Sequence, residues 1–554
     1  MPRTGGSQAR RAEGSPSTRR RGGRTRPAHL LHGFGSPAGF EERGVLTLVK
    51  GRGAYVWDIN GRKYLDGLAG LWNVAVGYGR KEIADAMAAQ SRALSYAPTL
   101  LGFSSVPAQR LAARIARLAP KGLTRVFFTS GGSDANESVI RLVRLYWRLR
   151  QRPDKIKIVA LNRAYHGTTT GAASLTGLPY FHQYYEPLLP GVVRMARPFC
   201  YRCELGLTYP GCALACADEL ERIVEREGAD TIGAFIAEPV QGVGGVVVPP
   251  PGYFERIRAL CDRHEILMVA DEVITGFGRL GTRFGIERWN VAPDMLVFAK
   301  SVTSGYLPLG GVILREGIYR TLVDAGPQFA LHHGFTYSGH PVVCAAALAN
   351  LDILEGEGLM KRARKLGTYL ARRLHGLTRH PIVGEVRAAG LMAAIELVRN
   401  RETKEGFPAD VAAAMRVRDA ALAQGVIVRA SADTVVLCPA LIITEAEIDR
   451  IVSVLDRALD EVGAELMRGE TVGSRQSAVR RAYRNERRAA ELGRVLHYDH
   501  APGRRTVNVL AGKGGRRDRA RQEHSRHRLQ RRAGRVTALP RRRLSRLSFG
   551  NSER

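Results

Sequence analysis

Short apolar runs alternate with longer amphipathic segments along most of this chain, and that alternation limits the fold more than any other feature of the sequence. The apolar runs at 125–129, 157–161 and 266–270 predict buried strands, and helical periodicity covers stretches such as 133–148. Buried strands that alternate with helices are typical of a mainly parallel sheet with both faces covered by helices. We therefore predict a large α/β domain over residues 86–350.

The C-terminal third has a different pattern. Its helical periods and apolar runs alternate in shorter units, at 343–354, 359–374, 383–386, 392–397, 411–424 and 434–437. This pattern is typical of a smaller α+β domain. We place that domain at 351–470 and expect the N-terminal segment 28–85 to contribute to it.

Charge is concentrated at the two ends of the chain. Lys+Arg total 84 against 52 Asp+Glu, but residues 1–30 hold 8 Arg with one acid, and residues 471–554 hold 24 basic and 6 acidic residues. The body at 31–470 keeps a net charge of only +7. Because they have little to bury, the tracts 1–27 and 471–554 are predicted to be largely disordered basic tails. The Arg- and Ser-rich start also resembles a transit peptide.

Composition excludes several classes of protein. The chain is 45% hydrophobic and 25% charged, which is typical of a globular protein. We find no apolar run of the ~18 residues that a bilayer span needs and no apolar segment typical of a secretory signal near the start. Seven cysteines in 554 residues fit a reducing compartment better than a disulfide scaffold. We expect a cytoplasmic protein with no membrane partner.

Two charged residues stand at the ends of apolar runs. Asp271 ends the run from Ile266, and Lys300 ends a second run from Met295. Strands of an open α/β sheet place their carboxyl ends at one edge, where such folds bind ligands. Taken singly, the carboxylate could cap a turn and the lysine could be a solvated surface residue. Together they suggest a pyridoxal phosphate site, with a Schiff-base lysine and a carboxylate that keeps the pyridine nitrogen protonated.

The stretch FFTSGGSDAN from Phe127 supplies a phosphate anchor for such a site. It passes from a strand into a helix, and its glycines let free N–H groups and the Ser133 hydroxyl face an anion. A glycine-rich turn that only caps the helix would look the same. Tyr165 follows the strand at 157–161 and could stack on a ring, although an isolated tyrosine there often belongs to a core.

These motifs resemble the class III, or omega-aminotransferase, family of pyridoxal phosphate enzymes over residues 28–468. The resemblance rests on YLDGLAGLWNVAVGYGR from Tyr64, FFTSGGSDAN, AYHGTTTG, FIAEPVQGVGG from Phe235, LMVADEVITGFGRLG, FAKSVTSGYLPLGG and HGFTYSGHP from His333. It implies the fold type I architecture of pyridoxal phosphate-dependent transferases. It also implies a homodimer, or a tetramer, with shared active sites.

The resemblance implies roles for individual residues. Lys300 matches the Schiff-base lysine that also shuttles the substrate proton, and Asp271 matches the acid on the pyridine nitrogen. Val273 is similar to the aliphatic contact below the ring. Glu238 matches the family's Ala-Glu-Pro motif, although a carboxylate before proline could simply end its strand.

The phosphate-binding positions follow from the same resemblance. Gly132 and Ser133 match the phosphate turn, Tyr165 matches the stacking aromatic residue, and Thr336 resembles the threonine that reaches the phosphate of the neighbouring subunit. The family's turn more usually reads Asn-Ser-Gly-Ser-Glu-Ala, whereas this chain has Ser-Gly-Gly-Ser-Asp-Ala from Ser130. Since the phosphate-facing pair is kept, we expect only a small effect on cofactor affinity.

Residues near both ends of the body bear on the substrates. Relatives that use 2-oxoglutarate tend to have an arginine in the strand that corresponds to 434–439, and this chain has none there. Arg429 instead resembles the mobile arginine of the pyruvate-using branch, and Trp72 resembles the aromatic wall of the amine pocket. Without the resemblance, they could be a surface arginine and a core tryptophan. The resemblance implies ping-pong transfer of an amino group from an omega-amino acid or primary amine to pyruvate.

Other functions stay open. The nearest alternative is an aminotransferase that uses 2-oxoglutarate with 4-aminobutyrate, putrescine or a similar donor. The same fold and lysine also support decarboxylase or aminomutase chemistry. Basic tails attract phosphate backbones, but these tails lack the interleaved aromatic residues that stack bases, so we do not expect nucleic-acid binding to be the function.

Two further patterns resemble ligand sites. Residues 276–281 fit the dinucleotide fingerprint G-x-G-x-x-G, but no helical period follows them. Cys200, Cys203, Cys212 and Cys216 have the spacing C-x2-C-x8-C-x3-C, which is close to that of structural zinc sites. Transamination needs no zinc, so we expect free thiols on an insertion and no metal.

Overall fold

The structure is a computed structural model that describes residues 24–25 and 29–468. The expectations for the tails at 1–27 and 471–554 lie outside these residues, apart from Arg24–Thr25. That pair forms β1, which pairs antiparallel with β2 (Val45–Leu46).

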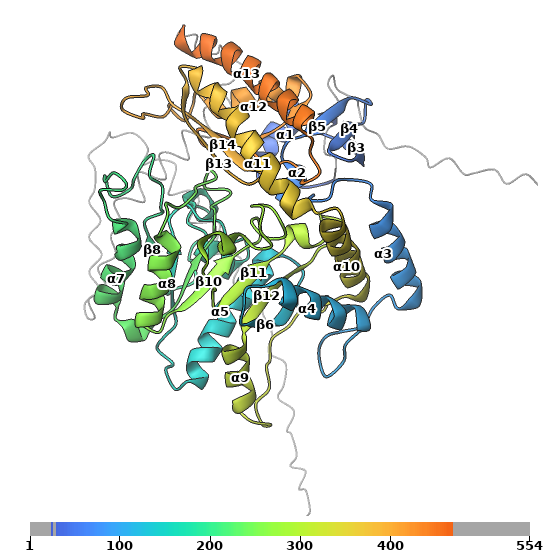
Figure 1. Cartoon of the computed structure of the whole chain (residues 1–554), viewed down its shortest axis with the longest axis vertical. Helices are drawn as coiled ribbons and strands as arrows, with labels where there is room; N and C mark the ends of the chain where they lie inside the picture. The colour runs from blue at the N-terminus through green and yellow to red at the C-terminus, as the bar shows by residue number, and fades with distance from the viewer. Residues whose placement is uncertain (1–23, 26–28, 469–554) are drawn as a thin grey trace, which may run out of the picture. The chain divides into compact units, whose positions relative to one another are not determined.

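A seven-stranded sheet forms the larger region of the described chain (Figure 1). Only β12 runs against its neighbours, β11 and β6. In spatial order the strands are β6 (Leu123–Thr129), β12 (Gly310–Arg315), β11 (Met295–Phe298), β10 (Leu267–Asp271), β9 (Ile232–Ala237), β7 (Lys157–Leu161) and β8 (Val192–Met195). The predicted mainly parallel sheet is thus confirmed.

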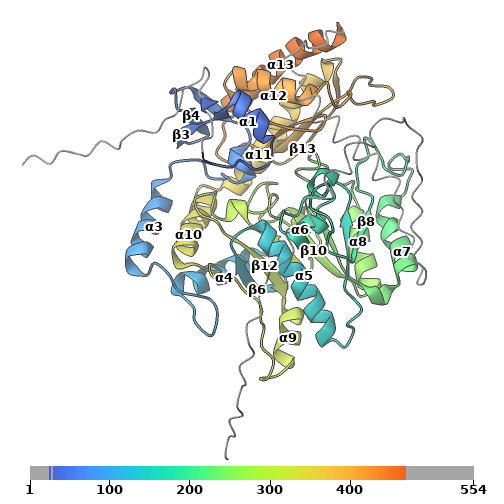
Figure 2. The ribbon, with the colours of Figure 1, turned by 180° about the vertical axis from the view of Figure 1, so that it is seen from behind.

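Helices cover both faces of this sheet because successive strand residues point to opposite sides. Val269 of β10 belongs to an apolar cluster with Val139 and Val143 of α5 (Gly132–Leu149), which lies in front of the sheet in Figure 2. Ala270, the next residue, belongs to another cluster with α7 (Ala215–Glu227) and α8 (Tyr253–Arg263). The expected helical cover on both faces is therefore confirmed.

Two smaller sheets lie together at one end of the molecule, above the large sheet in Figure 1. One is antiparallel, with the order β13 (Val383–Ala389), β14 (Met392–Leu397), β17 (Thr434–Leu437) and β16 (Arg429–Ser431). The other has the order β15 (Val426–Ile427), β5 (Lys63–Asp66), β4 (Tyr55–Asp58) and β3 (Leu48–Arg52). Because β15 pairs in parallel with β5, strands from distant parts of the sequence share one sheet. The domain limits given above stay a prediction.

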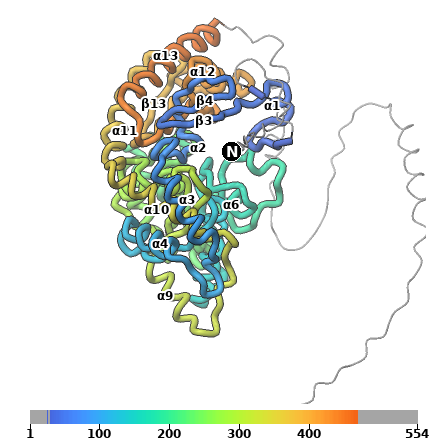
Figure 3. Tube along the Cα trace, turned by 90° about the vertical axis from the view of Figure 1, so that its right-hand side faces the viewer, coloured from blue at the N-terminus to red at the C-terminus, as the bar shows by residue number. Residues whose placement is uncertain are grey.

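The remaining helices surround these sheets. They are α1 (Pro37–Arg43), α2 (Ala69–Trp72), α3 (Lys81–Ala93), α4 (Val106–Leu118), α6 (Thr170–Leu175), α9 (Glu316–Asp324), α10 (Pro341–Gly356), α11 (Leu359–His375), α12 (Ala413–Ala423) and α13 (Glu445–Met467). Figure 3 shows α3 and α4 beside α10, far from them in the sequence. Within the described residues, every helix is too short or too polar to span a bilayer.

Local signals account for the starts of two helices. The Ser105 hydroxyl accepts a hydrogen bond from the Ala108 N–H at the start of α4, and a proline follows in its first turn. Thr444 and Glu447 form a reciprocal capping box at the start of α13.

Candidate active site

Five parallel strands of the large sheet deliver residues to one edge. The carboxyl ends of β6, β7, β9, β10 and β11 lead into Gly132, Tyr165, Glu238, Asp271 and Lys300 respectively. This edge borders a cavity of about 160 Å³. Its lining residues are Gly132, Ser133, Tyr165, His166, Gly167, Glu238, Asp271, Val273, Ile274 and Lys300. The structure therefore brings together all the residues predicted for the cofactor except Thr336.

Asp271, the last residue of β10, is buried and held from three sides. Its Oδ2 accepts a hydrogen bond from Asn136 Nδ2 at 2.9 Å and lies 2.7 Å from His166 Nδ1. Its Oδ1 accepts from the Val273 N–H at 3.1 Å. These contacts fix the carboxylate in the cavity wall, and buried charge needs such partners.

Glu238 is a second buried carboxylate in the same wall. Its Oε1 accepts from the Tyr165 N–H at 3.0 Å, and its Oε2 accepts from the Gly242 N–H at 2.8 Å. Burial raises the pKa of Glu238 to about 7, and the nearby Asp271 charge adds to the rise. Through its two hydrogen bonds, Glu238 joins the turns after β7 and β9.

Lys300 follows β11 and starts a short 3-10 helix, η4 (Lys300–Val302). Its backbone has φ +49°, a left-handed conformation that is strained for a residue with a side chain. Burial lowers the pKa of its amine from the ordinary 10.5 to about 8, although the charges of Asp271 and Glu238 oppose that fall. A neutral, nucleophilic amine is thus accessible near physiological pH.

The N-terminus of α5 borders the cavity as an anion cradle. A Cβ on Gly132 would come within 3.0 Å of a Val273 methyl, and a Cβ on Gly167 would lie 2.5 Å from Ser133 Oγ. Because neither position tolerates a side chain without displacement, the backbone N–H groups and the serine hydroxyl stay close to the cavity. The positive end of the helix dipole adds to the attraction for an anion.

Arg429 and Trp72 lie outside the residues that line the cavity. The indole of Trp72 is buried, and the Arg429 guanidinium lies over it with 5.4 Å between the carbon Cζ and the ring centroid. Burial lowers the pKa of Arg429, whereas Tyr180 and Tyr165 oppose that fall. The predicted arginine and tryptophan thus meet each other beside the cavity.

Thr336 is exposed and does not reach the cavity of its own chain. Its carbonyl oxygen accepts a hydrogen bond from the Tyr96 hydroxyl at 2.9 Å.

His166 and Asn136 complete the site, although the sequence reasoning assigned them no role. His166 directly follows Tyr165, and Asn136 comes three residues after Ser133 on α5, on the same helical face. Asn136 Nδ2 also donates to the His166 carbonyl oxygen at 2.7 Å. The helical spacing from Ser133 was the signal that could have identified Asn136.

The residues present fit a ligand that carries a phosphate, an aromatic nitrogen and a carbonyl group. The cradle at Gly132 and Ser133 suits the phosphate, Asp271 suits a protonated ring nitrogen, and Lys300 suits the carbonyl carbon. These groups are the functional parts of pyridoxal phosphate.

Comparison with known proteins agrees with this chemistry. The family described as Aminotransferase class-III matches residues 40–459. Putrescine--pyruvate aminotransferase of Pseudomonas aeruginosa is 40% identical over 440 residues, which cover 79% of this chain and 96% of that protein. Diaminobutyrate--2-oxoglutarate transaminase of Halomonas elongata is 39% identical over 429 residues, which cover 76% of this chain and 92% of that protein.

Solved structures are similarly close. An (S)-enantioselective omega-transaminase from Thermomicrobium roseum has a TM-score of 0.76 and 45% identity, covering 78% of this chain and 96% of that one. A PLP-bound amine transaminase from an uncultivated Pseudomonas species has a TM-score of 0.77 and 40% identity, covering 79% of this chain and 99% of that one. The chain therefore belongs to the class III aminotransferases, enzymes of fold type I that use pyridoxal phosphate.

Proposed function

We propose that the chain transfers the amino group of an omega-amino acid or primary amine to pyruvate in a ping-pong cycle. The observation that carries the catalytic part is the convergence of Lys300, Asp271 and the start of α5 on one cavity. The observation that bears on the acceptor is the contact of Arg429 with Trp72.

Specific residues are proposed to hold the cofactor. Gly132 and Ser133 bind the phosphate, Val273 and Tyr165 contact the two faces of the ring, and Asp271 pairs with the ring nitrogen. When bound, pyridoxal phosphate supplies a ring that accepts electrons from the carbon that carries the amine. The hydrogen bonds of Asp271 to Asn136 and His166 keep its carboxylate oriented for that task.

Lys300 is proposed to bind the cofactor and then to move the substrate proton. Its lowered pKa, about 8, leaves a useful fraction of neutral amine at neutral pH. The protonated form that results is stabilised by the nearby Asp271 and Glu238 charges. One side chain can therefore take up a proton at Nζ and return it.

Arg429 is proposed to bind the carboxylate of the oxo acid. A guanidinium gives bidentate contact to a carboxylate and also stacks on an aromatic face, which fits its place over Trp72. The strand β17 carries no arginine that could serve a second, distal carboxylate. This supports pyruvate over 2-oxoglutarate, and the P. aeruginosa relative, a putrescine--pyruvate aminotransferase, points the same way.

A panel of amines with two acceptors tests the assignment. Purified protein with pyridoxal phosphate is incubated with each amine and either pyruvate or 2-oxoglutarate, and alanine and glutamate are measured. We expect alanine as the main product. Glutamate as the main product would favour the reaction named for the H. elongata relative. Release of carbon dioxide or a rearranged amine without either product would indicate a decarboxylase or an aminomutase.

The exposed Thr336 supports a shared active site. We propose a homodimer in the cytoplasm, in which Thr336 approaches the cofactor phosphate of the other copy. Light scattering after size exclusion measures the mass, and a monomer with full activity would contradict the shared site.

A further inference from the structure

Four cysteines lie between the end of β8 and the first turn of α7. Cys200, Cys203, Cys212 and Cys216 all line a small cavity of about 10 Å³, which holds roughly one water-sized sphere. All four are free thiols. The other cysteines, Cys261, Cys344 and Cys438, are buried elsewhere.

The surroundings of these thiols are mainly apolar. Pro198, Phe199, Leu205 and Leu207 complete much of the cavity wall. Arg197 and Tyr209 are the other polar side chains of the lining. All four thiols therefore border one small and mostly apolar space.

In place of the free thiols expected from the sequence, we propose that Cys200, Cys203, Cys212 and Cys216 form a structural zinc site. Two short cysteine pairs, Cys200/Cys203 in the loop and Cys212/Cys216 at the start of α7, can supply the four thiolates of a structural zinc centre. Such a centre is closed, with no free position for a substrate, and so its role is to stabilise structure.

Zinc binding would contract the loop. With Zn–S bonds of ~2.3 Å, tetrahedral sulfurs lie roughly 3.8 Å apart. Within the described residues, no three of the four sulfurs lie within 4.8 Å of one another. Cys216 is fixed on α7, whereas Cys200, Cys203 and Cys212 lie in bends, turns and irregular chain, so we expect the loop to move toward Cys216 when zinc binds.

The loop has anchors on two other parts of the chain. Arg197 donates to the Gly244 carbonyl oxygen at 3.1 Å, and Arg202 forms an ion pair with Glu396 of β14 at 3.1 Å. Phe199 lies under the guanidinium of Arg387 in β13, with 4.7 Å from Cζ to the ring centroid. A metal that fixes the loop would therefore also fix its contacts with the C-terminal sheet.

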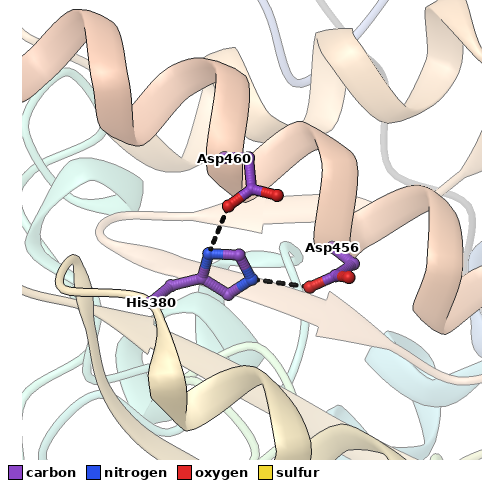
Figure 4. A group of neighbouring side chains, drawn as sticks. All are labelled: His380, Asp456 and Asp460. Carbon is purple, nitrogen blue, oxygen red and sulfur yellow. Dashed lines mark hydrogen bonds and ion pairs between the residues drawn. The ribbon is translucent and has the colours of Figure 1, made fainter.

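A second group of metal-ligand residues has geometry that favours a different role. His380, Asp456 and Asp460 place one ligand atom each within 4.8 Å of one another. Figure 4 shows that the imidazole uses opposite nitrogens: Nε2 lies 2.7 Å from Asp456 Oδ1 and Nδ1 lies 3.1 Å from Asp460 Oδ1. Two nitrogens of one ring cannot bind the same ion, so this group is an ion-paired clasp between α13 and the segment before β13.

Zinc content tests the proposal directly. Full-length protein, loaded with pyridoxal phosphate, is purified from zinc-supplemented cells, and zinc per chain is measured by mass spectrometry. We expect about one zinc in the wild type and in the control Cys261→Ala, and at least a roughly tenfold loss in the double variant C203S/C212S. X-ray absorption at the zinc edge should show sulfur ligands at ~2.3 Å.

A second measurement does not depend on how the variant folds. Thiols of the native wild type are titrated with a disulfide reagent before and after a zinc chelator, and four additional thiols should react after chelation. The melting temperature should fall by several degrees at the same time. Equal zinc in the wild type and the double variant would overturn the proposal. So would a non-reduced intact mass that shows disulfides in the loop.

Discussion

The cofactor edge of the large sheet and the Arg429–Trp72 pair beside it are built in different ways. At the edge, Asp271 is held by Asn136, His166 and the Val273 N–H, within or just beyond neighbouring parallel strands. Arg429 in β16 meets Trp72 of α2 through a ring contact, and burial lowers its pKa. The first region holds its carboxylate with several directional hydrogen bonds. The second has fewer directional contacts, which suits the carboxylate-binding role proposed for Arg429.

The largest effect should come from removing the charge of Asp271 at the cofactor edge. Asp271→Asn removes the charge proposed to pair with the ring nitrogen and leaves the shape almost unchanged. We expect kcat to fall by ~10²–10³-fold, which is the size of the loss of one preorganised electrostatic partner. Steady-state rates with pyruvate measure it.

Asp271→Glu keeps the charge and should recover part of the rate. If Asp271→Asn changes KM alone and leaves kcat intact, the carboxylate positions a substrate rather than the cofactor.

The cofactor edge is also easier to predict from the sequence than the Arg429–Trp72 pair. Asp271 and Lys300 could be placed from sequence because each ends an apolar run, and the register of β10 and β11, with Asp271 opposite Val297, sets them at one edge. His166 could not be placed in the same way. Its contact with Asp271 spans separate strands, and only the fold shows which residue after β7 faces β10.

The substrate side depends on contacts between segments that are distant in sequence. The sequence suggests a substrate role for Trp72 and for Arg429 separately. Their contact depends on how β16 and α2 are arranged, which no local sequence pattern encodes. Two short strands there, β15 and β16, also escaped the sequence analysis because two or three residues carry no usable period.

Removing the guanidinium should affect one substrate more than the other. Arg429→Ala deletes the charge-assisted contact proposed for the oxo acid, so KM for pyruvate should rise by ~10–100-fold, which is the effect of losing a hydrogen bond to a charged group. A primary amine without a carboxylate should keep its KM. Arg429→Lys should recover only part of the affinity because it lacks the planar fork.

Separate KM values for donor and acceptor decide this prediction. Equal increases for pyruvate and for an uncharged amine would show that Arg429 supports the fold around Trp72 rather than binding the acceptor.

A smaller effect concerns the proton affinity of Lys300. In the cofactor-free protein, the reactivity of this amine toward an amine-acylating reagent should rise with pH and reach half its maximum near pH 8. Glu238 helps to keep the charged form, so Glu238→Gln should shift that midpoint to lower pH. Competitive labelling followed by peptide mass spectrometry gives both midpoints.

The lowered pKa of Lys300 also makes the stability of the fold depend on pH. Because the folded state prefers the neutral amine, Lys300 costs stability below pH 8, and this cost fades as pH rises from about 8 to the unfolded value of ~10.4. A Glu238→Gln midpoint at or above that of the wild type would show that Glu238 is not ionised when Lys300 titrates.

The smallest effect tests whether the C-terminal region is fixed independently of the cofactor edge. His380→Phe keeps the ring but removes both ion pairs to α13, so the free energy of unfolding should fall by about 1 kcal/mol, with no loss of bound pyridoxal phosphate. Hydrogen bonds from Arg379 and His380 lower the pKa of Asp456, although burial opposes that fall. A carboxylate with a lowered pKa contributes stability at neutral pH and loses it as pH falls below ~4, so the difference between wild type and variant should shrink in acid.

Asp460→Asn is the matched control: its carboxylate is 69% exposed, and denaturant curves should show a loss of only a few tenths of a kcal/mol. If His380→Phe instead releases the cofactor, the clasp and the cofactor edge form one cooperative unit, and the C-terminal region is not fixed independently of that edge.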